Sequence, residues 1–143
     1  MIEVLNYDNL SNLFIEMSQI SNGRYLIIFT DTEKLLEWMF ELYMNSDELG
    51  CSVDIRHDVV TCKRTNARIY LATVGDNKKI KSSNPTMPSS FDRVLYEDGM
   101  DPRLLPSIRV RKHIRREFIA RTHYENSDAL NDFLNDFSIV NWI

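Results

Sequence analysis

The chain has 143 residues, of which 43% are hydrophobic and 27% charged, and its net charge is −4. This length suits one domain with a continuous core, so we expect a single domain over residues 1–143. Its two cysteines lack the spacing of a zinc site or a disulfide framework, and no apolar run approaches the roughly 18 residues of a membrane span, so we expect a soluble, cytoplasmic protein with no membrane partner.

The mean charge hides a strong segregation along the chain. Residues 1–60 hold 3 Lys and Arg against 11 Asp and Glu, residues 61–123 hold 14 against 6, and residues 124–143 hold none against 4. The basic middle could meet a polyanion. Alternatively, the acidic and basic parts neutralise each other within the fold.

The beginning of the chain predicts a strand followed by a helix. Residues 2–5, IEVL, form a short apolar run typical of a strand. Apolar residues then recur at helical spacing from Leu10 to Ile20, after an N-cap at Asp8 or Asn9. Gly23 stands where a glycine often ends a helix.

Residues 24–74 predict a buried strand, a second helix and three short strands. The stretch RYLIIFT over 24–30 is apolar without alternation, as in a parallel strand covered on both faces. Thr30 and Glu33 have the spacing of a capping box, which predicts a helix from there to about Tyr43. Period-two patterns over 51–74 predict the short strands, with a tight turn at Thr65 and Asn66.

The second half opens with a polar loop, GDNKKIKSSNPTMPSS, over residues 75–90, where function often concentrates. FDRVLYED over 91–98 is an apolar strand that ends in Glu97 and Asp98. We then expect a helix from about Pro106 to His113, a strand over 117–121, a helix near 127–136 and a short apolar tail. This alternation predicts an α/β fold, with a mostly parallel sheet flanked by helices and a β-hairpin insertion.

The order of these elements resembles the ATPase half of phage large terminases and related P-loop helicases. The resemblance rests on the strand LIIFT, the hairpin TCKRTNARIYLAT, the strand RVLYED and the strand FIART, and it covers nearly the whole chain. In that family the acid pair at the strand end is Asp then Glu, which hold Mg²⁺ and orient the attacking water. Glu97 and Asp98 stand there in reversed order, and Thr30 and Thr122 match the positions of the second strand's end and the coupling motif.

One part of the family pattern is missing. A P-loop needs glycines to wrap the phosphates and a lysine to reach them, whereas residues 6–12, NYDNLSN, contain neither and add Asp8, which would repel a triphosphate. The resemblance therefore implies a P-loop-NTPase-like core without a P-loop. It implies a non-catalytic binding or regulatory protein of phage or viral DNA packaging or replication, located in the host cytoplasm, with no cofactor.

A competing interpretation makes the chain an enzyme. Asp31, Glu97 and Asp98 all lie at predicted carboxyl ends of strands, where open α/β sheets bind ligands. These three catalytic candidates could hold one or two Mg²⁺ ions, with Glu97 and Asp98 as metal ligands, in a nuclease or phosphotransferase. The alternative is that Asp31 lies beside a helix N-cap and the acid pair is a solvated turn before Gly99.

Nine basic residues form the strongest candidate binding surface. They could contact a nucleic-acid backbone or an acidic protein partner, or pair with acids of this chain. A virion structural protein or a host antagonist, with an incidental fold, is a third possibility. The nine residues are Lys78, Lys79, Lys81, Arg109, Arg111, Lys112, Arg115, Arg116 and Arg121.

Overall fold

The computed structural model describes residues 2–7, 10–74 and 80–122. Several predictions fall outside this part of the chain: the N-cap at Asp8 or Asn9, two of the loop lysines, and the helix near 127–136 with its apolar tail. The side chains of Arg111, Arg121 and Thr122 are also outside the description.

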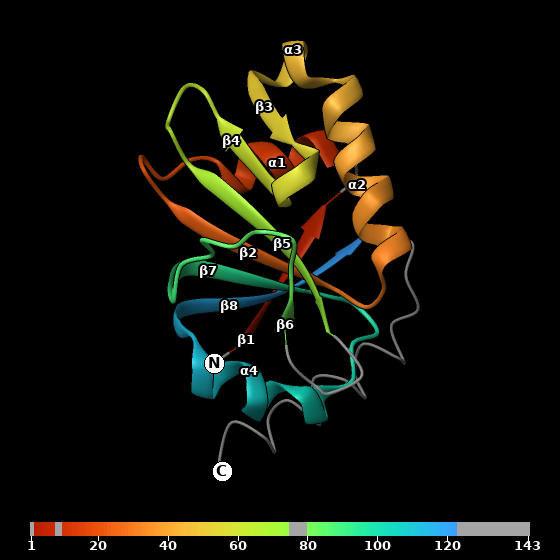
Figure 1. The fold of residues 1–143 in the computed structure, drawn as a ribbon, viewed down its shortest axis with the longest axis vertical. Coiled ribbons are helices and arrows are strands. Elements are labelled where there is room, and N and C mark those ends of the chain that lie inside the picture. Colours follow the sequence, from red (N-terminus) through yellow and green to blue (C-terminus); the bar gives the residue numbers. More distant parts are fainter. Residues whose placement is uncertain (1, 8–9, 75–79, 123–143) are drawn as a thin grey trace.

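The described strands form one mixed sheet (Figure 1), in the order β1-β8-β7-β2-β5-β4-β3, with β6 paired to β5. Five neighbouring strands are parallel: β1 (Ile2–Tyr7), β8 (His113–Thr122), β7 (Ser90–Glu97), β2 (Arg24–Phe29) and β5 (Arg68–Val74). The remaining strands pair antiparallel: β4 (Val59–Cys62), β3 (Cys51–Asp54) and β6 (Ile80–Lys81). The α/β fold and its hairpin insertion are confirmed, and the parallel arrangement applies to these five strands.

Helices cover both faces of the sheet. One face packs against α1 (Leu10–Met17) and α2 (Thr32–Met44), with the short α3 (Ser46–Leu49) beyond them. The other face packs against α4 (Leu105–Arg111) and the 3-10 helix that precedes it. Because side chains alternate along a strand, Ile27 of β2 faces α2 while Leu26 and Ile28 lie in the core on the α4 side. Strand β2 is therefore covered on both faces, as its continuous apolar run predicts.

Two local predictions are wrong for identifiable reasons. The N-cap of α2 is Asp31, whose side chain accepts a hydrogen bond from the backbone N–H of Lys34, so Thr30 precedes the cap. Helix α1 ends at Met17, well before Gly23. Gly23 is buried, and a Cβ there would lie 2.9 Å from the Ile20 carbonyl oxygen and from the Tyr25 ring. This glycine is required by close packing and does not cap the helix.

The segment after β7 folds as expected in type but with different bounds. Helix α4 ends at Arg111, because Lys112 already has extended backbone angles (φ −130°, ψ 137°). Strand β8 then begins at His113, whose N–H bonds the Ser89 carbonyl, four residues before the predicted start at Glu117. Pairing with β7 along nearly its full length extends β8 beyond the range that the alternation of apolar residues suggests.

Candidate functional site

The topology brings the predicted acidic residues to the same end of the sheet. Strand β2 continues through α2 toward β5, whereas its neighbour β7 continues through α4 toward β8, on the opposite face and in the opposite direction. The carboxyl ends of β2 and β7 therefore diverge, and such a switch point is where open α/β sheets bind ligands. Thr30 and Asp31 follow β2, and Glu97 and Asp98 follow at the end of β7.

At this switch point Glu97 contacts neighbouring elements rather than facing open solvent. One carboxylate oxygen accepts a hydrogen bond from the Thr30 N–H at 2.5 Å, and the other lies 3.0 Å from the Lys34 ammonium. The Glu97 side chain is 16% exposed and that of Lys34 is 55% exposed. Glu97 thus links the end of β7 to the first turn of α2, and both of its oxygens are engaged.

The other two acids have different environments. Asp31 caps α2, and its Oδ1 accepts a hydrogen bond from the backbone N–H of Lys34 at 2.8 Å. Asp98 is half-buried, and its carboxylate has no hydrogen-bond or ion-pair partner among the described residues. In the same part of the chain, no group of three or more His, Cys, Asp or Glu side chains is arranged to hold a metal ion. Metal binding by Asp31, Glu97 and Asp98 stays a prediction.

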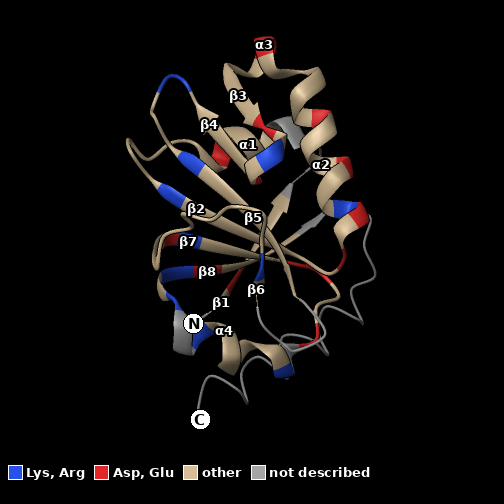
Figure 2. Cartoon of the chain, in the orientation of Figure 1, with Lys and Arg blue, Asp and Glu red and all other residues tan. Residues whose placement is uncertain are grey.

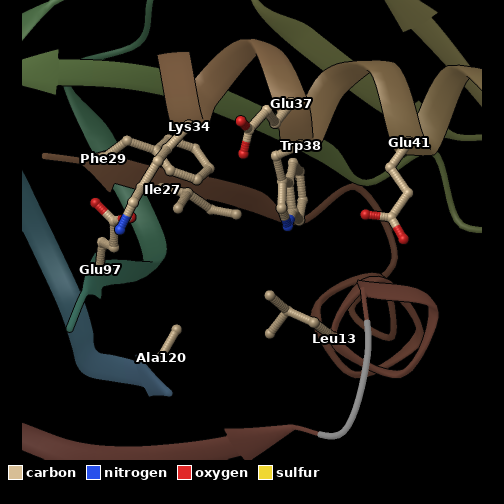
Figure 3. A pocket seen from close by; sticks show the side chains of 9 residues that line it. All are labelled: Leu13, Ile27, Phe29, Lys34, Glu37, Trp38, Glu41, Glu97 and Ala120. Carbon is tan, nitrogen blue, oxygen red and sulfur yellow. The ribbon is translucent and has the colours of Figure 1, made fainter. Parts of the chain in front are cut away.

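A cavity of about 200 Å³ lies beside Glu97, between α1 and α2 above β2 and β8 (Figure 3). Its apolar part is lined by Leu13, Ile27, Phe29, Trp38 and Ala120, and its polar part by Lys34, Glu37, Glu41 and Glu97. Three carboxylates against one ammonium make the polar part acidic. Residue patterns assign the apolar members to the core, and only the packing of α1 against α2 shows that they also border a cavity.

Three of the nine basic residues have partners within the described part of the chain. Arg109 makes two hydrogen bonds to Glu117, at 3.0 and 2.6 Å, and Arg116 pairs with Glu3 and lies over the Phe118 ring. Lys112 donates to the Pro88 carbonyl and lies 5.8 Å from the centre of the Phe91 ring, and burial lowers the pKa of its ammonium. Pairing with acids of this chain, one of the alternatives left open by the sequence, therefore accounts for Arg109 and Arg116, whereas Lys112 is held by a carbonyl and a ring.

The other six basic residues divide into three groups. Arg115 and Lys81 are exposed. The side chains of Arg111 and Arg121 are outside the description. Lys78 and Lys79 lie outside the described residues altogether, so their predicted role is untested.

A buried network stabilises the α4 side of the sheet. Glu117 accepts hydrogen bonds from Arg109 on α4 and from the hydroxyl of Tyr96 on β7. Burial and the nearby Glu117 carboxylate raise the pKa of Tyr96 well above its ordinary value. Sequence reasoning missed Glu117, because its partners lie 8 and 21 residues away along the chain.

Comparisons with known proteins identify a fold but no family. No protein-family model matches the chain, and no curated protein matches it. Among the described residues, no helix has both the length and the apolar character needed to cross a membrane. The crystal structure of the HK97 bacteriophage large terminase matches with a TM-score of 0.60 at 8% sequence identity, over 98% of this chain and 33% of the terminase chain. The chain therefore has a terminase-like α/β fold and spans about a third of the length of the protein that it resembles.

Proposed function

We propose that this chain is a non-catalytic binding or regulatory component of phage DNA-processing machinery, with a terminase-like fold that no longer serves ATP hydrolysis. The observation that carries the proposal is the closure of Glu97 onto Thr30 and Lys34. A carboxylate that holds Mg²⁺ or orients a water must present free oxygen atoms, whereas both oxygens of Glu97 are engaged, by the Thr30 N–H and by the Lys34 ammonium.

The adjacent cavity supports the same proposal. Its volume of about 200 Å³ is below the roughly 300–1,000 Å³ of ordinary ligand pockets. Glu37, Glu41 and Glu97 would repel the phosphates of a nucleotide, and Lys34 is already paired with Glu97. Residues 6–12 also lack the glycines and the lysine of a phosphate-binding loop.

An exposed apolar stripe on α2 supports a role in protein binding. Four apolar side chains along one side of this helix are solvent-exposed: Leu36 by 43%, Phe40 by 59%, Tyr43 by 51% and Met44 by 75%. Such a stripe is typical of a contact surface between proteins. The exposed acids Glu33, Glu37 and Glu41 lie beside it, so the matching partner carries apolar residues flanked by basic ones.

The test is turnover in the presence of metal. Purified protein is incubated with ATP, single-stranded DNA, duplex DNA and RNA in Mg²⁺ or Mn²⁺, and released phosphate and cleaved strands are measured. We expect no turnover above that of a Glu97→Gln variant. Metal-dependent turnover that Glu97→Gln abolishes would overturn the proposal and favour a nuclease or phosphotransferase that uses Asp31, Glu97 and Asp98.

The exposed part of the basic segment is assigned to contact with DNA or with a DNA-processing complex. Arg115 and Lys81 are the described members with exposed side chains and no recorded partner, and Arg116 is half-exposed beside Glu3. Reversing the charge of Arg115 and Arg116 should weaken binding of labelled DNA. Unchanged binding would remove this segment from the interface.

A further inference from the structure

Two arginines that are far apart in the sequence lie together at the amino-terminal ends of β2 and β5, away from Glu97. Arg24 begins β2 and Arg68 begins β5, and the two are direct partners in the parallel register. Neighbouring strands lie about 4.8 Å apart, so the two backbones hold these side chains side by side on the α4 face. Both residues are exposed, and among the described residues neither guanidinium forms an ion pair.

The loops that precede the two arginines are locked to each other. Asn22 and Asn66 both have left-handed backbone angles, with φ of 57° and 58°, and the Asn66 amide donates to the Asn22 side-chain oxygen at 2.9 Å. The N–H of Asn22 bonds the Thr65 carbonyl at 2.8 Å, and the N–H of Arg68 bonds the Gly23 carbonyl at 2.9 Å. Two separate loops are thus fixed as one support for the arginine pair.

A polar hollow of about 670 Å³ opens beside this pair. Arg24 and Arg68 line it, together with the hydroxyl-bearing residues Tyr70, Thr86 and Ser89. Phosphate oxygens accept hydrogen bonds from guanidinium and hydroxyl groups, and paired arginines can hold a phosphate bidentately. The hollow therefore presents the donor set of a phosphate site.

Electrostatics also favour an anion in this hollow. Like charges on directly opposite strand positions destabilise a sheet, and an anion between them would relieve that repulsion. The nearby Asp92 carboxylate accepts the Arg24 N–H at 2.8 Å. Asp54, which lines the adjoining hollow with Arg68, is bonded to His57, and the hydrogen bond from His57 lowers the Asp54 pKa. Neither acid forms an ion pair with the arginines.

Positive charge continues beyond the hollow. Lys63 and Arg64 are exposed on the loop that joins β4 to β5. Figure 2 shows Lys and Arg gathered on this loop and at the amino-terminal parts of β5, β2, β7 and β8, along one margin of the molecule. A row of cations longer than one phosphate matches the repeating charges of a nucleic-acid backbone.

We propose that the hollow between Arg24 and Arg68 binds a phosphodiester of a nucleic-acid backbone. The DNA-related context of the proposed function guides only the choice of ligand. The site lies at the amino-terminal ends of β2 and β5, whereas Glu97 lies at the carboxyl end of β7. This proposal does not depend on whether the chain hydrolyses ATP. Neither Arg115 nor Arg116 lines the hollow.

The test measures anisotropy of fluorescein-labelled single-stranded and duplex DNA between 50 and 200 mM NaCl. The hollow variant is Arg24→Gln with Arg68→Gln, and the matched variant, with the same change in net charge, is Lys34→Gln with Arg103→Gln, two exposed cations outside both proposed binding surfaces. We expect the hollow variant to lose at least 10-fold in affinity and about two units in the slope of log affinity against log salt. We expect the matched variant to lose less than about 3-fold.

Three outcomes would overturn the proposal: no DNA binding by the unaltered protein, an equal loss in both variants, or a larger loss in the matched variant. A lysine version, Arg24→Lys with Arg68→Lys, keeps the charge and should recover part of the affinity, and far-ultraviolet circular dichroism checks that each variant folds. Inorganic phosphate is the probe for the free anion. Binding of phosphate without binding of DNA would contradict a nucleic-acid site.

Discussion

Replacing Glu97 by glutamine tests whether this acid is a structural link or an active-site group. Its hydrogen bond from the Thr30 N–H is charge-assisted, and such bonds contribute about 1.5–3 kcal/mol. The ion pair to Lys34 adds at most about 1 kcal/mol, because that lysine is 55% exposed. Glutamine keeps one acceptor for Thr30 but loses the charge, so we expect Glu97→Gln to lower the free energy of unfolding by about 1–2 kcal/mol.

Urea unfolding followed by circular dichroism, together with thermal unfolding, measures this change. For a chain of this size, 1 kcal/mol corresponds to roughly 2–4 °C in Tm. Combining Glu97→Gln with Lys34→Gln should reveal a coupling of about 0.5–1 kcal/mol between the two side chains. The control is Asp98→Asn, which should change stability by less than about 0.5 kcal/mol, because Asp98 has no partner among the described residues.

The direction of the stability change in Glu97→Gln distinguishes a structural link from a metal ligand. Acids gathered for metal binding repel each other in the empty site, and neutralising one of them usually stabilises the protein. An unchanged or higher stability in Glu97→Gln would refute the reasoning that Glu97 serves as a link.

Three further substitutions probe other parts of the fold. Tyr96→Phe should lower the free energy of unfolding by about 1.5–3 kcal/mol at pH 7, because it removes the hydrogen bond to Glu117. Because the pKa of Tyr96 is raised in the folded state, its contribution to the free energy of unfolding is complete below the ordinary tyrosine pKa of about 10 and falls above it. The urea midpoints of the variant and the parent should therefore converge as the pH rises past about 10. A constant difference between the two midpoints would contradict this. Gly23→Ala should cost about 1–3 kcal/mol through its 2.9 Å contacts, whereas Gly50→Asn, at a left-handed position with open space, should cost less than 1 kcal/mol; equal losses would oppose the packing argument. Phe40→Ser should change stability by less than about 0.5 kcal/mol, and a loss above 1 kcal/mol would show that the α2 stripe is covered within the chain.

Local sequence patterns, such as apolar runs and capping signals, predict much of the fold. The unbroken apolar run of residues 24–30 predicts a strand covered on both faces, and β2 is buried from Tyr25 to Phe29. Apolar spacing and a capping signal predict α2, although the cap moves by one residue to Asp31. The strand that ends at Glu97 and the helix after Pro106 were also predictable, because periodicity acts over a few residues.

The sites depended on tertiary structure, because their partners are far apart in the chain. The Glu97 carboxylate meets Thr30 across 67 residues, which occurs only because β7 lies beside β2 in the sheet. Arg109 could be recognised as basic from its sequence, but only the packing of α4 on β8 joins it to Glu117. Arg24 and Arg68 look like unrelated charges until the parallel register of β2 and β5 sets them side by side. Local sequence patterns therefore predicted most of the described strands and helices, and the order and register of the strands decided which charges meet.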